Sequence, residues 1–280
     1  MSHHWSDPVS YLRHALAQDQ FTLYCQPIAA LFGIVIYPMA EVLVRLREEE
    51  RALLPPGEFL PILEHYGMLA ALDRWVVSEA VRRLSNGPEI PRFSVNLSAQ
   101  TIADPTFPDF FADEIAATRV PADSVLFEVD EADALALPAC MPRLSATLGS
   151  LGSGVVIDGF GRAADPLAAL RFPCVQYVKV HDSLTRGLAS ADAPTAKLAS
   201  LLRLTSELGV GVIAECVEDQ EVLKKLKAMN FRYAQGFGIC VPQSIDEVSE
   251  LPARRLSERE PRPVQGKLDL GVPQQQVSLH

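Results

Sequence analysis

The chain has 280 residues, of which 48% are hydrophobic and 21% charged, and its formal net charge at pH 7 is −10. A chain this acidic is not expected to bind long DNA or RNA, because phosphate backbones are bound by basic faces. No apolar run approaches the roughly 18 residues of a membrane-spanning helix, and no basic segment leads into an apolar stretch at the start, so we expect a cytoplasmic protein without membrane insertion.

Two apolar, β-rich runs come first, at residues 21–28 and 34–46. The connection between them, residues 29–33, includes Gly33 and is too short for a helical crossover. A hairpin is the remaining solution, so the sheet should begin with an antiparallel strand.

Segments with helical spacing then alternate with further strand candidates. Two helices are predicted between Gly57 and Leu84, with a break near Gly67, and further helices are predicted at 110–117, 140–149, 194–208 and 220–229. This alternation predicts an α/β fold. The barrel domain should span residues 1–250, while 251–280, rich in Pro, Arg, Gln and Glu, should form a flexible tail that cannot bury enough apolar surface to fold alone.

Seven of the strand candidates end in a single polar or charged residue, which packing alone does not explain. Burying an unpaired charge costs roughly several kcal/mol. In a TIM-like (β/α)8 barrel, by contrast, each strand delivers a functional side chain to a shared mouth at its carboxyl end. We therefore predict such a barrel, with the first strand antiparallel. The residues are Glu41, Asn96, Glu128, Asp158, Lys179, Glu215 and Gln235.

Four of these residues offer only oxygen ligands, a set that selects hard cations. They are Glu41, Asn96, Glu128 and Asp158, and they predict Mg²⁺ or Mn²⁺ at one site, or no metal if the site is lost. Lys179 could hold a phosphate or orient a water, and Glu215 and Glu218 add acceptors. Acidic residues, a lysine and a divalent ion in one cleft suit phosphate-ester binding or hydrolysis.

Each residue also has a simpler interpretation. Asn96 could cap a helix that begins near Ala99. Lys179 could pair with a neighbouring carboxylate, and Glu218 could be an acid in the first turn of a helix. Arg45 is either a buried ion-pair partner or a phosphate clamp.

The cysteines predict neither a disulfide framework nor a zinc site. They are odd in number and far apart, and most lie inside apolar runs, so we expect buried, reduced thiols. They are Cys25, Cys140, Cys174, Cys216 and Cys240.

From about residue 8 to 248 the chain closely resembles the EAL domain family, bacterial phosphodiesterases of cyclic di-GMP. The resemblance is carried by YCQPI, AEVLVRL in place of the Glu-Ala-Leu signature, PPGEFLPILE, LDRWV, SVNLS, FEVDE, IDGFG, YVKV, IAECVE and AQGFGICVP. It implies a barrel whose first strand is antiparallel. In active members, two metal ions at the mouth activate a water that cleaves one phosphodiester bond and gives linear pGpG.

The resemblance also implies roles for individual residues. Glu215 would help to hold a second metal, Lys179 would orient the water, and Glu218 would support the mouth. The first metal would be held by Glu41, Asn96, Glu128 and Asp158. The nucleotide would be bound by Gln26, Glu41, Leu43, Arg45, Asn96, Asp158, Gln235 and Pro242.

Several residues depart from the family pattern at the positions that form the second metal site in active members. The family's paired Asp-Asp reads Asp158-Gly159 here, which removes a carboxylate that ligates this ion in active members. The following segment, 161–167, reads GRAADPL where the family has Gly-Thr-Gly-Tyr-Ser-Ser-Leu. Because EAL domains often dimerise near this segment, the resemblance implies a homodimer that is altered or absent here.

Two further departures lie at neighbouring strand ends. The family's Lys-x-Asp reads Lys179-Val180-His181, and Asp182, one residue later, should face the wrong way if the strand keeps its register. His181 itself could ligate a metal. Cys216 replaces a glycine and adds bulk beside Glu215.

Three hypotheses follow. The leading one is a degenerate EAL domain that binds cyclic di-GMP without cleaving it and signals to a partner protein, as some relatives do in the control of pili or motility. The second is a slow phosphodiesterase in which Asp182 or His181 restores the second metal. The third is a protein-binding regulator that no longer binds nucleotide.

Overall fold

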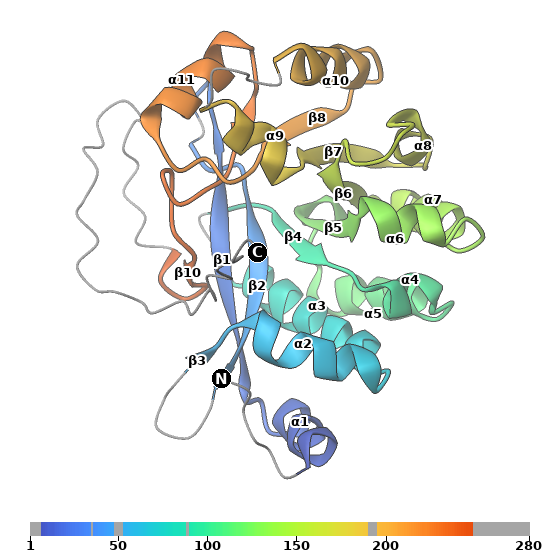
Figure 1. Ribbon diagram of the computed structural model, residues 1–280. Coiled ribbons are helices and arrows are strands. Elements are labelled where there is room, and N and C mark those ends of the chain that lie inside the picture. Colours follow the sequence, from blue (N-terminus) through green and yellow to red (C-terminus); the bar gives the residue numbers. More distant parts are fainter. Residues whose placement is uncertain (1–6, 35, 48–52, 88–89, 190–194, 249–280) are drawn as a thin grey trace, which may run out of the picture.

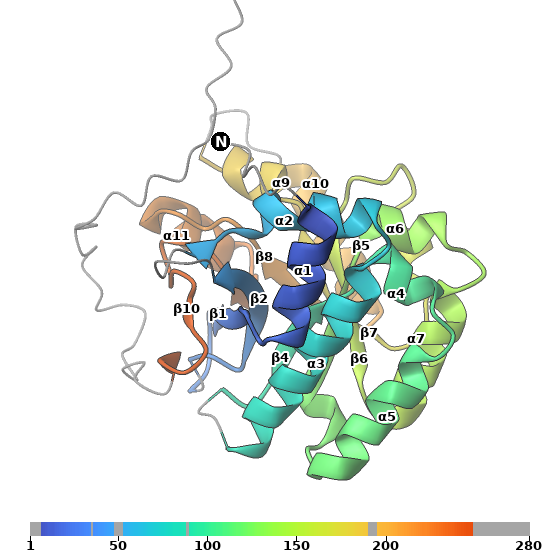
Figure 2. The ribbon, with the colours of Figure 1, turned by 90° about the horizontal axis from the view of Figure 1, so that it is seen from below.

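The computed structural model describes residues 7–248 except 35, 48–52, 88–89 and 190–194. The predicted tail, 251–280, lies outside the described residues. Eight strands of one mixed sheet close into a barrel in these residues, with helices on the outside (Figures 1 and 2). The predicted TIM-like barrel with an antiparallel first strand is therefore confirmed.

The strands of the ring follow chain order. From β2 to β9 neighbours are parallel, and β1 closes the ring by pairing antiparallel with both β2 and β9. The short strands β3 (Leu53–Leu54) and β10 (Gln243–Ser244) extend the sheet beside β2 and β1. The ring consists of β1 (Phe21–Ala30), β2 (Met39–Arg47), β4 (Phe93–Asn96), β5 (Val125–Asp130), β6 (Gly154–Phe160), β7 (Val175–Val180), β8 (Gly211–Ala214) and β9 (Tyr233–Ala234).

The helices cover the outer face of the sheet, and α3, α5 and α7 pack side by side on it (Figure 2). The predicted break near Gly67 is confirmed, because one helix ends at His65, the next begins at Leu69, and Gly67 has φ +68°. The helices are α1 (Pro8–Ala17), α2 (Pro56–His65), α3 (Leu69–Ser85), α4 (Ala99–Ala103), α5 (Phe107–Thr118), α6 (Glu131–Ala136), α7 (Met141–Leu151), α8 (Leu167–Leu170), α9 (Asp182–Gly187), α10 (Thr195–Glu207) and α11 (Gln220–Ala228).

The predicted strand 34–46 is wrong at its start. The strand begins only at Met39, directly after Pro38, which has no N–H to give to a ladder. It then runs to Arg47 because the antiparallel pairing with β1 continues as far as Phe21 opposite Leu46. Glu41 therefore lies in the third position of its strand and not at its end.

The barrel interior is filled by a small apolar layer, separate from the large core between strands and helices. The layer consists of Ile28, Met39, Leu126, Val156 and Ile213, with Tyr177 and Tyr233 packed against it. Since alternate residues of a strand share a face, the residue two positions nearer the mouth also points inward. On β2, β5, β6 and β7 those residues are Glu41, Glu128, Asp158 and Lys179, and directly after β8 it is Glu215.

Candidate site at the barrel mouth

Lys179 lies at the centre of the mouth, with a side chain only 1% exposed. Its Nζ lies 2.7 Å from Glu41 Oε2, 2.7 Å from Glu128 Oε2 and 3.4 Å from Glu215 Oε1. Burial opposes the charged ammonium, but these carboxylates raise the pKa of Lys179 well above 10.5. The simpler interpretation of Lys179, an ion pair with a neighbouring carboxylate, is thus confirmed, and the lysine has three such partners.

Glu41 is held by amides as well as by the lysine. Asn96 Nδ2 donates to Glu41 Oε1 at 3.0 Å, and Gln235 Nε2 donates to Glu41 Oε2 at 2.8 Å. Gln235 Nε2 also contacts Gln26 Oε1 at 3.2 Å, and Gln26 Nε2 donates to the Cys240 carbonyl at 3.0 Å. Predicted residues from β1, β2, β4 and the end of β9 therefore form one network with Lys179.

The carboxylates of the mouth differ in protonation because their partners differ. Burial raises the pKa of Glu128 to about 8, and the charge of Glu41 adds to this rise. Burial likewise raises the pKa of Glu215 to about 7. Burial also opposes the charge on Glu41, but Lys179 and the amide hydrogen bonds lower its pKa. Glu41 is therefore the ionised partner of Lys179 near neutral pH.

The raised pKa of Glu215 predicts a pH-dependent stability. Between about pH 4.5 and 7 the folded chain keeps a proton that the unfolded chain releases, so the free energy of unfolding falls as pH rises through this window. Glu215→Gln cannot titrate and should remove on the order of 3 kcal/mol of that fall. The measurement is urea unfolding at several pH values in EDTA.

The control for this experiment is Glu218→Gln, because the Glu218 side chain is 63% exposed. It should leave the slope of stability against pH unchanged. Equal slopes for wild type and Glu215→Gln would show that the Glu215 carboxyl is not protonated in the folded protein.

Several predicted residues lie away from Lys179. Leu43 and Arg45 share the face of Glu41 farther along β2, and both are half-buried. Pro242 is half-buried in the segment before β10. Glu218 follows β8, and its Oε1 lies 3.8 Å from Arg186 Nη2.

Two of the simpler interpretations are wrong. The cap of α4 is Ser98, whose Oγ accepts from Thr101 N, so Asn96 is not the helix cap. The cap of α11 is Asp219, so Glu218 precedes that helix and is not in its first turn.

His181 and Asp182 form the start of α9. His181 Nδ1 lies 2.8 Å from Ser183 Oγ and caps the helix. Asp182 is the first residue of the helix and not a strand residue, and its Oδ2 lies 3.6 Å from Arg186 Nε. Both side chains are engaged with their own helix.

The cysteines are free in the structure, as predicted. Their predicted burial holds only for Cys25 and Cys240, since the other three are half-buried. Cys216 is one of these, and it has φ +53°, a conformation that a glycine adopts more easily.

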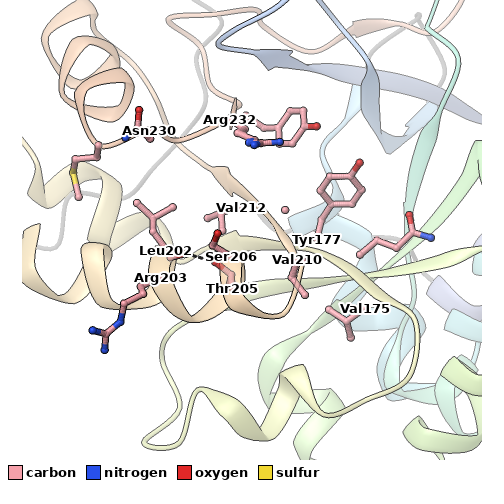
Figure 3. A pocket seen from close by; sticks show the side chains of 15 residues that line it. Val175, Tyr177, Leu202, Arg203, Thr205, Ser206, Val210, Val212, Asn230 and Arg232 are labelled. Carbon is pink, nitrogen blue, oxygen red and sulfur yellow. Dashed lines mark hydrogen bonds between the residues drawn. The ribbon is translucent and has the colours of Figure 1, made fainter.

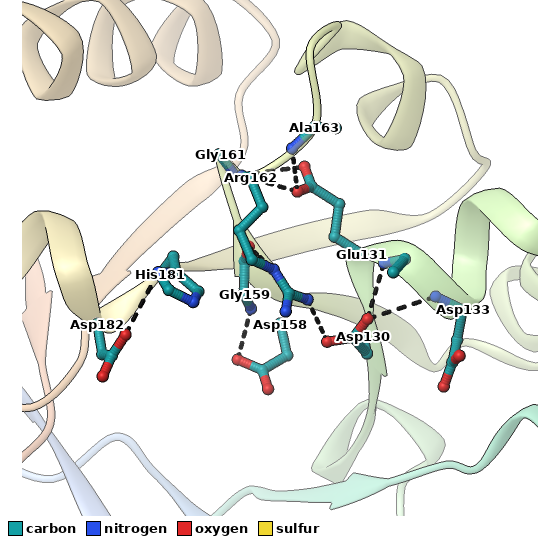
Figure 4. A network of polar contacts seen from close by, with 11 residues as sticks. Asp130, Glu131, Asp133, Asp158, Gly159, Gly161, Arg162, Ala163, His181 and Asp182 are labelled. Atoms are coloured by element: carbon teal, nitrogen blue, oxygen red, sulfur yellow. Dashed lines mark hydrogen bonds and ion pairs between the residues drawn. The ribbon is translucent and has the colours of Figure 1, made fainter. Parts of the chain in front are cut away.

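A cluster beside Asp158 was not predicted from the sequence (Figure 4). The side chain of Arg162 folds back over Gly159 and pairs with Asp130, while the buried Glu131 carboxylate accepts from backbone N–H groups of residues 161–163. The signal in the sequence is an arginine three residues after a glycine at a strand end, which does not by itself place the guanidinium.

Oxygen donors of the kind that bind Mg²⁺ or Mn²⁺ line the mouth. However, among the described residues no three Asp, Glu, His or Cys side chains converge closely enough to hold an ion. The carboxylates of Glu41, Glu128 and Glu215 turn to Lys179 instead. The donor types fit a divalent ion, whereas their arrangement fits the ammonium group.

A cavity of about 760 Å³ lies at the other end of the barrel, lined by the first residues of β7, β8 and β9 and by α10 (Figure 3). Val175, Gly211 and Tyr233 are among its walls, and it contains none of the predicted site residues. No helix in the described part of the chain has both the length and the apolar character needed to cross a bilayer.

The barrel and its mouth agree with a known family. The model of the EAL domain matches residues 10–242. The chain belongs to the EAL domain family. It is 29% identical over 250 residues to the cyclic di-GMP phosphodiesterase PdeF of Escherichia coli, and 30% identical over 245 residues to the cyclic di-GMP phosphodiesterase NbdA of Pseudomonas aeruginosa. These matches cover 88% and 85% of this EAL chain but only 33% and 31% of the relatives, so the chain spans about a third of their length.

Solved EAL domains have the same fold. The FimX EAL domain of Pseudomonas aeruginosa bound to c-di-GMP superposes with a TM-score of 0.80 at 28% identity, over 85% of this chain and 96% of that one. The c-di-GMP complex of the PaMucR phosphodiesterase gives 0.78 at 25% identity, over 86% and 99%. This EAL chain is therefore similar both to domains named as phosphodiesterases and to a FimX domain that binds the nucleotide.

Proposed function

We propose that this EAL domain is a receptor for cyclic di-GMP with little or no phosphodiesterase activity. The observation that supports the proposal most directly is the glycine at position 159 and the arginine packed against it. Gly159 has no side chain, and its φ of +63° disfavours one, while Arg162 occupies the space into which a side chain would project. A carboxylate that would hold a second ion there is missing, and a two-metal reaction needs both ions to clamp the attacking and leaving oxygens.

The nucleotide would enter above Lys179. Gln26 and Glu41 face each other across β1 and β2, and Leu43 and Arg45 continue the same face of β2. The other proposed contacts are Asn96, Asp158, Gln235 and Pro242. The similarity to the FimX domain bound to c-di-GMP supports this assignment.

A divalent ion has at most one place in this proposal. Glu41, Asn96, Glu128 and Asp158 would hold it, and nucleotide binding would not require it. Glu215, Glu218 and Lys179 would then be remnants of a hydrolytic site. A partner protein that reads the bound state, and a homodimer, are further parts of the proposal.

The second hypothesis, a slow phosphodiesterase rescued by His181 or Asp182, finds less support. His181 Nδ1 caps α9, and Asp182 Oδ2 lies 3.6 Å from Arg186 Nε, so the capping nitrogen and this carboxylate already have partners in their own helix. Measuring cyclic di-GMP binding by calorimetry, with and without Mn²⁺, and pGpG by chromatography separates the hypotheses. Binding without product supports the receptor, product at appreciable rates refutes it, and no binding leaves the protein-binding regulator.

Arg45→Ala should lower the affinity for cyclic di-GMP by about 10- to 100-fold, the effect of losing a charge-assisted hydrogen bond. The guanidinium is pre-positioned, because Nη1 donates to the Val44 carbonyl at 2.8 Å and Cζ lies 5.4 Å from the ring centroid of Tyr24. Calorimetric titration measures the affinity, and thermal unfolding checks the fold. Arg82→Ala on α3 is the control, and an Arg45→Ala variant with wild-type affinity would show that this face does not bind the nucleotide.

A further inference from the structure

Arg162 places a second basic group at the mouth, next to β6. Its Nε donates to the Gly159 carbonyl at 3.2 Å, and its Nη2 pairs with Asp130 Oδ2. The other oxygen of Asp130 caps α6 by accepting from Ala132 N at 2.7 Å. The guanidinium is therefore attached to two neighbouring elements, β6 and the start of α6 (Figure 4).

The backbone below this side chain is also fixed. Glu131, which is 1% exposed, accepts from Gly161 N at 3.2 Å and from Arg162 N and Ala163 N at 2.9 Å each. A buried carboxylate with three backbone donors holds the turn in one conformation. The position of Arg162 thus follows from the turn as well as from its own contacts.

Gly159 is what makes room for the guanidinium. A Cβ at position 159 would lie 2.7 Å from Arg162 Nη2 and 2.9 Å from its Cζ, closer than real contacts allow. Any side chain there would displace Arg162 from its present place. The glycine and the arginine therefore form one feature, in which a basic group fills the volume beside Asp158 that a side chain at 159 would otherwise take.

Lys179 and Arg162 differ in what their side chains can still bind. Lys179 is buried and surrounded by three carboxylates. The Arg162 side chain is 42% exposed, and its Nη1 has no hydrogen-bond partner among the described residues. Burial opposes its charge, but Asp130, Glu131 and Asp158 together outweigh burial and raise the pKa of Arg162, so it stays protonated.

We propose that Arg162 acts as a built-in cation at the mouth, binding a phosphate oxygen of the nucleotide and opposing the binding of a metal ion beside Asp158. Nη1, which has no hydrogen-bond partner among the described residues, can donate a charge-assisted hydrogen bond to a phosphate oxygen. The first part of this inference, that Arg162 binds a phosphate oxygen, rests on the proposed function. It implies that nucleotide binding does not depend on a divalent ion.

The first test measures the affinity for cyclic di-GMP by calorimetry in EDTA and in Mn²⁺. Wild type should bind equally well in both. Arg162→Ala should bind about 10- to 100-fold more weakly in EDTA, and Arg162→Lys should recover part of the loss. Arg203→Ala, an exposed arginine of α10, is the control and should match wild type. If wild type binds and Arg162→Ala binds equally well in EDTA, the phosphate role is overturned.

The second test uses Mn²⁺ alone and does not need the nucleotide. Removing the positive charge beside Asp158 should strengthen Mn²⁺ binding to Arg162→Ala by about tenfold relative to wild type. Identical Mn²⁺ affinities would overturn the claim that Arg162 opposes a metal ion. If wild type fails to bind cyclic di-GMP at all, the proposed function fails, and the phosphate role fails with it, while the Mn²⁺ comparison still decides the second role.

Discussion

Lys179→Met should destabilise the barrel by about 3–5 kcal/mol, the cost of removing one partner from a buried ion pair. The ammonium contacts Glu41 and Glu128 at 2.7 Å each, and the methionine leaves both carboxyls without a cation in a buried mouth. Guanidinium unfolding at pH 6 and pH 8 measures the loss. A loss below about 1 kcal/mol, the range of exposed pairs, would contradict the central position of Lys179.

The pH dependence of this loss has a definite sign. Without the lysine, the pKa of Glu41 should rise above its unfolded value of 4.5, so the folded variant holds a proton that the unfolded chain releases. Its stability should therefore fall further as pH rises, and the loss should be larger at pH 8 than at pH 6. Glu128→Gln in the Lys179→Met background should recover part of it, and Lys224→Met, on a side chain 71% exposed, is the control.

Gly159→Asp should not restore hydrolysis. The new side chain would displace the guanidinium of Arg162, whose Nη2 lies 2.7 Å from the Cβ position. We expect the new carboxylate to pair with the displaced guanidinium and so to be neutralised. The φ of +63° adds a backbone cost of about 1–2 kcal/mol, somewhat less for aspartate than for most residues. Chromatography for pGpG in Mn²⁺ measures the activity, and turnover close to that of an active phosphodiesterase after this single substitution would contradict the account.

A matched control separates the backbone cost from the contact. Gly67 has φ +68° and no atom within 4 Å of its Cβ position. Gly67→Asp should therefore show the backbone cost alone, without any change in nucleotide binding. The double variant Gly159→Asp with Arg162→Ala should gain Mn²⁺ affinity relative to Gly159→Asp, because its carboxylate is no longer neutralised.

The barrel and most of its mouth could be predicted because the residues that face inward alternate along each strand, and this alternation is visible in the sequence. An apolar residue followed two positions later by a polar one, as in Leu126 and Glu128 or Ile213 and Glu215, places both on the inner face. The short connection before β2 fixed the antiparallel start.

The helix α1 was not predicted, although Asp7 before Pro8 is a helix-start signal and Asp7 Oδ1 accepts from Ser10 N at 3.1 Å.

The contacts among the site residues could not be predicted in the same way. The contacts of Lys179 with three carboxylates depend on the register of four strands, β2, β5, β7 and β8, which no local pattern encodes. The placement of Arg162 depends on the turn held by Glu131, a residue 31 positions earlier in the chain. Long-range packing, and not local propensity, decided both.

The central claim is that the mouth binds cyclic di-GMP without cleaving it. The most direct measurement incubates the full chain with cyclic di-GMP and Mn²⁺, determines the bound nucleotide by equilibrium dialysis, and identifies it by chromatography. The account predicts that the bound nucleotide is recovered intact, in the same amount when EDTA replaces Mn²⁺. Conversion to pGpG at a rate typical of active EAL phosphodiesterases, or no bound nucleotide in either condition, would contradict it.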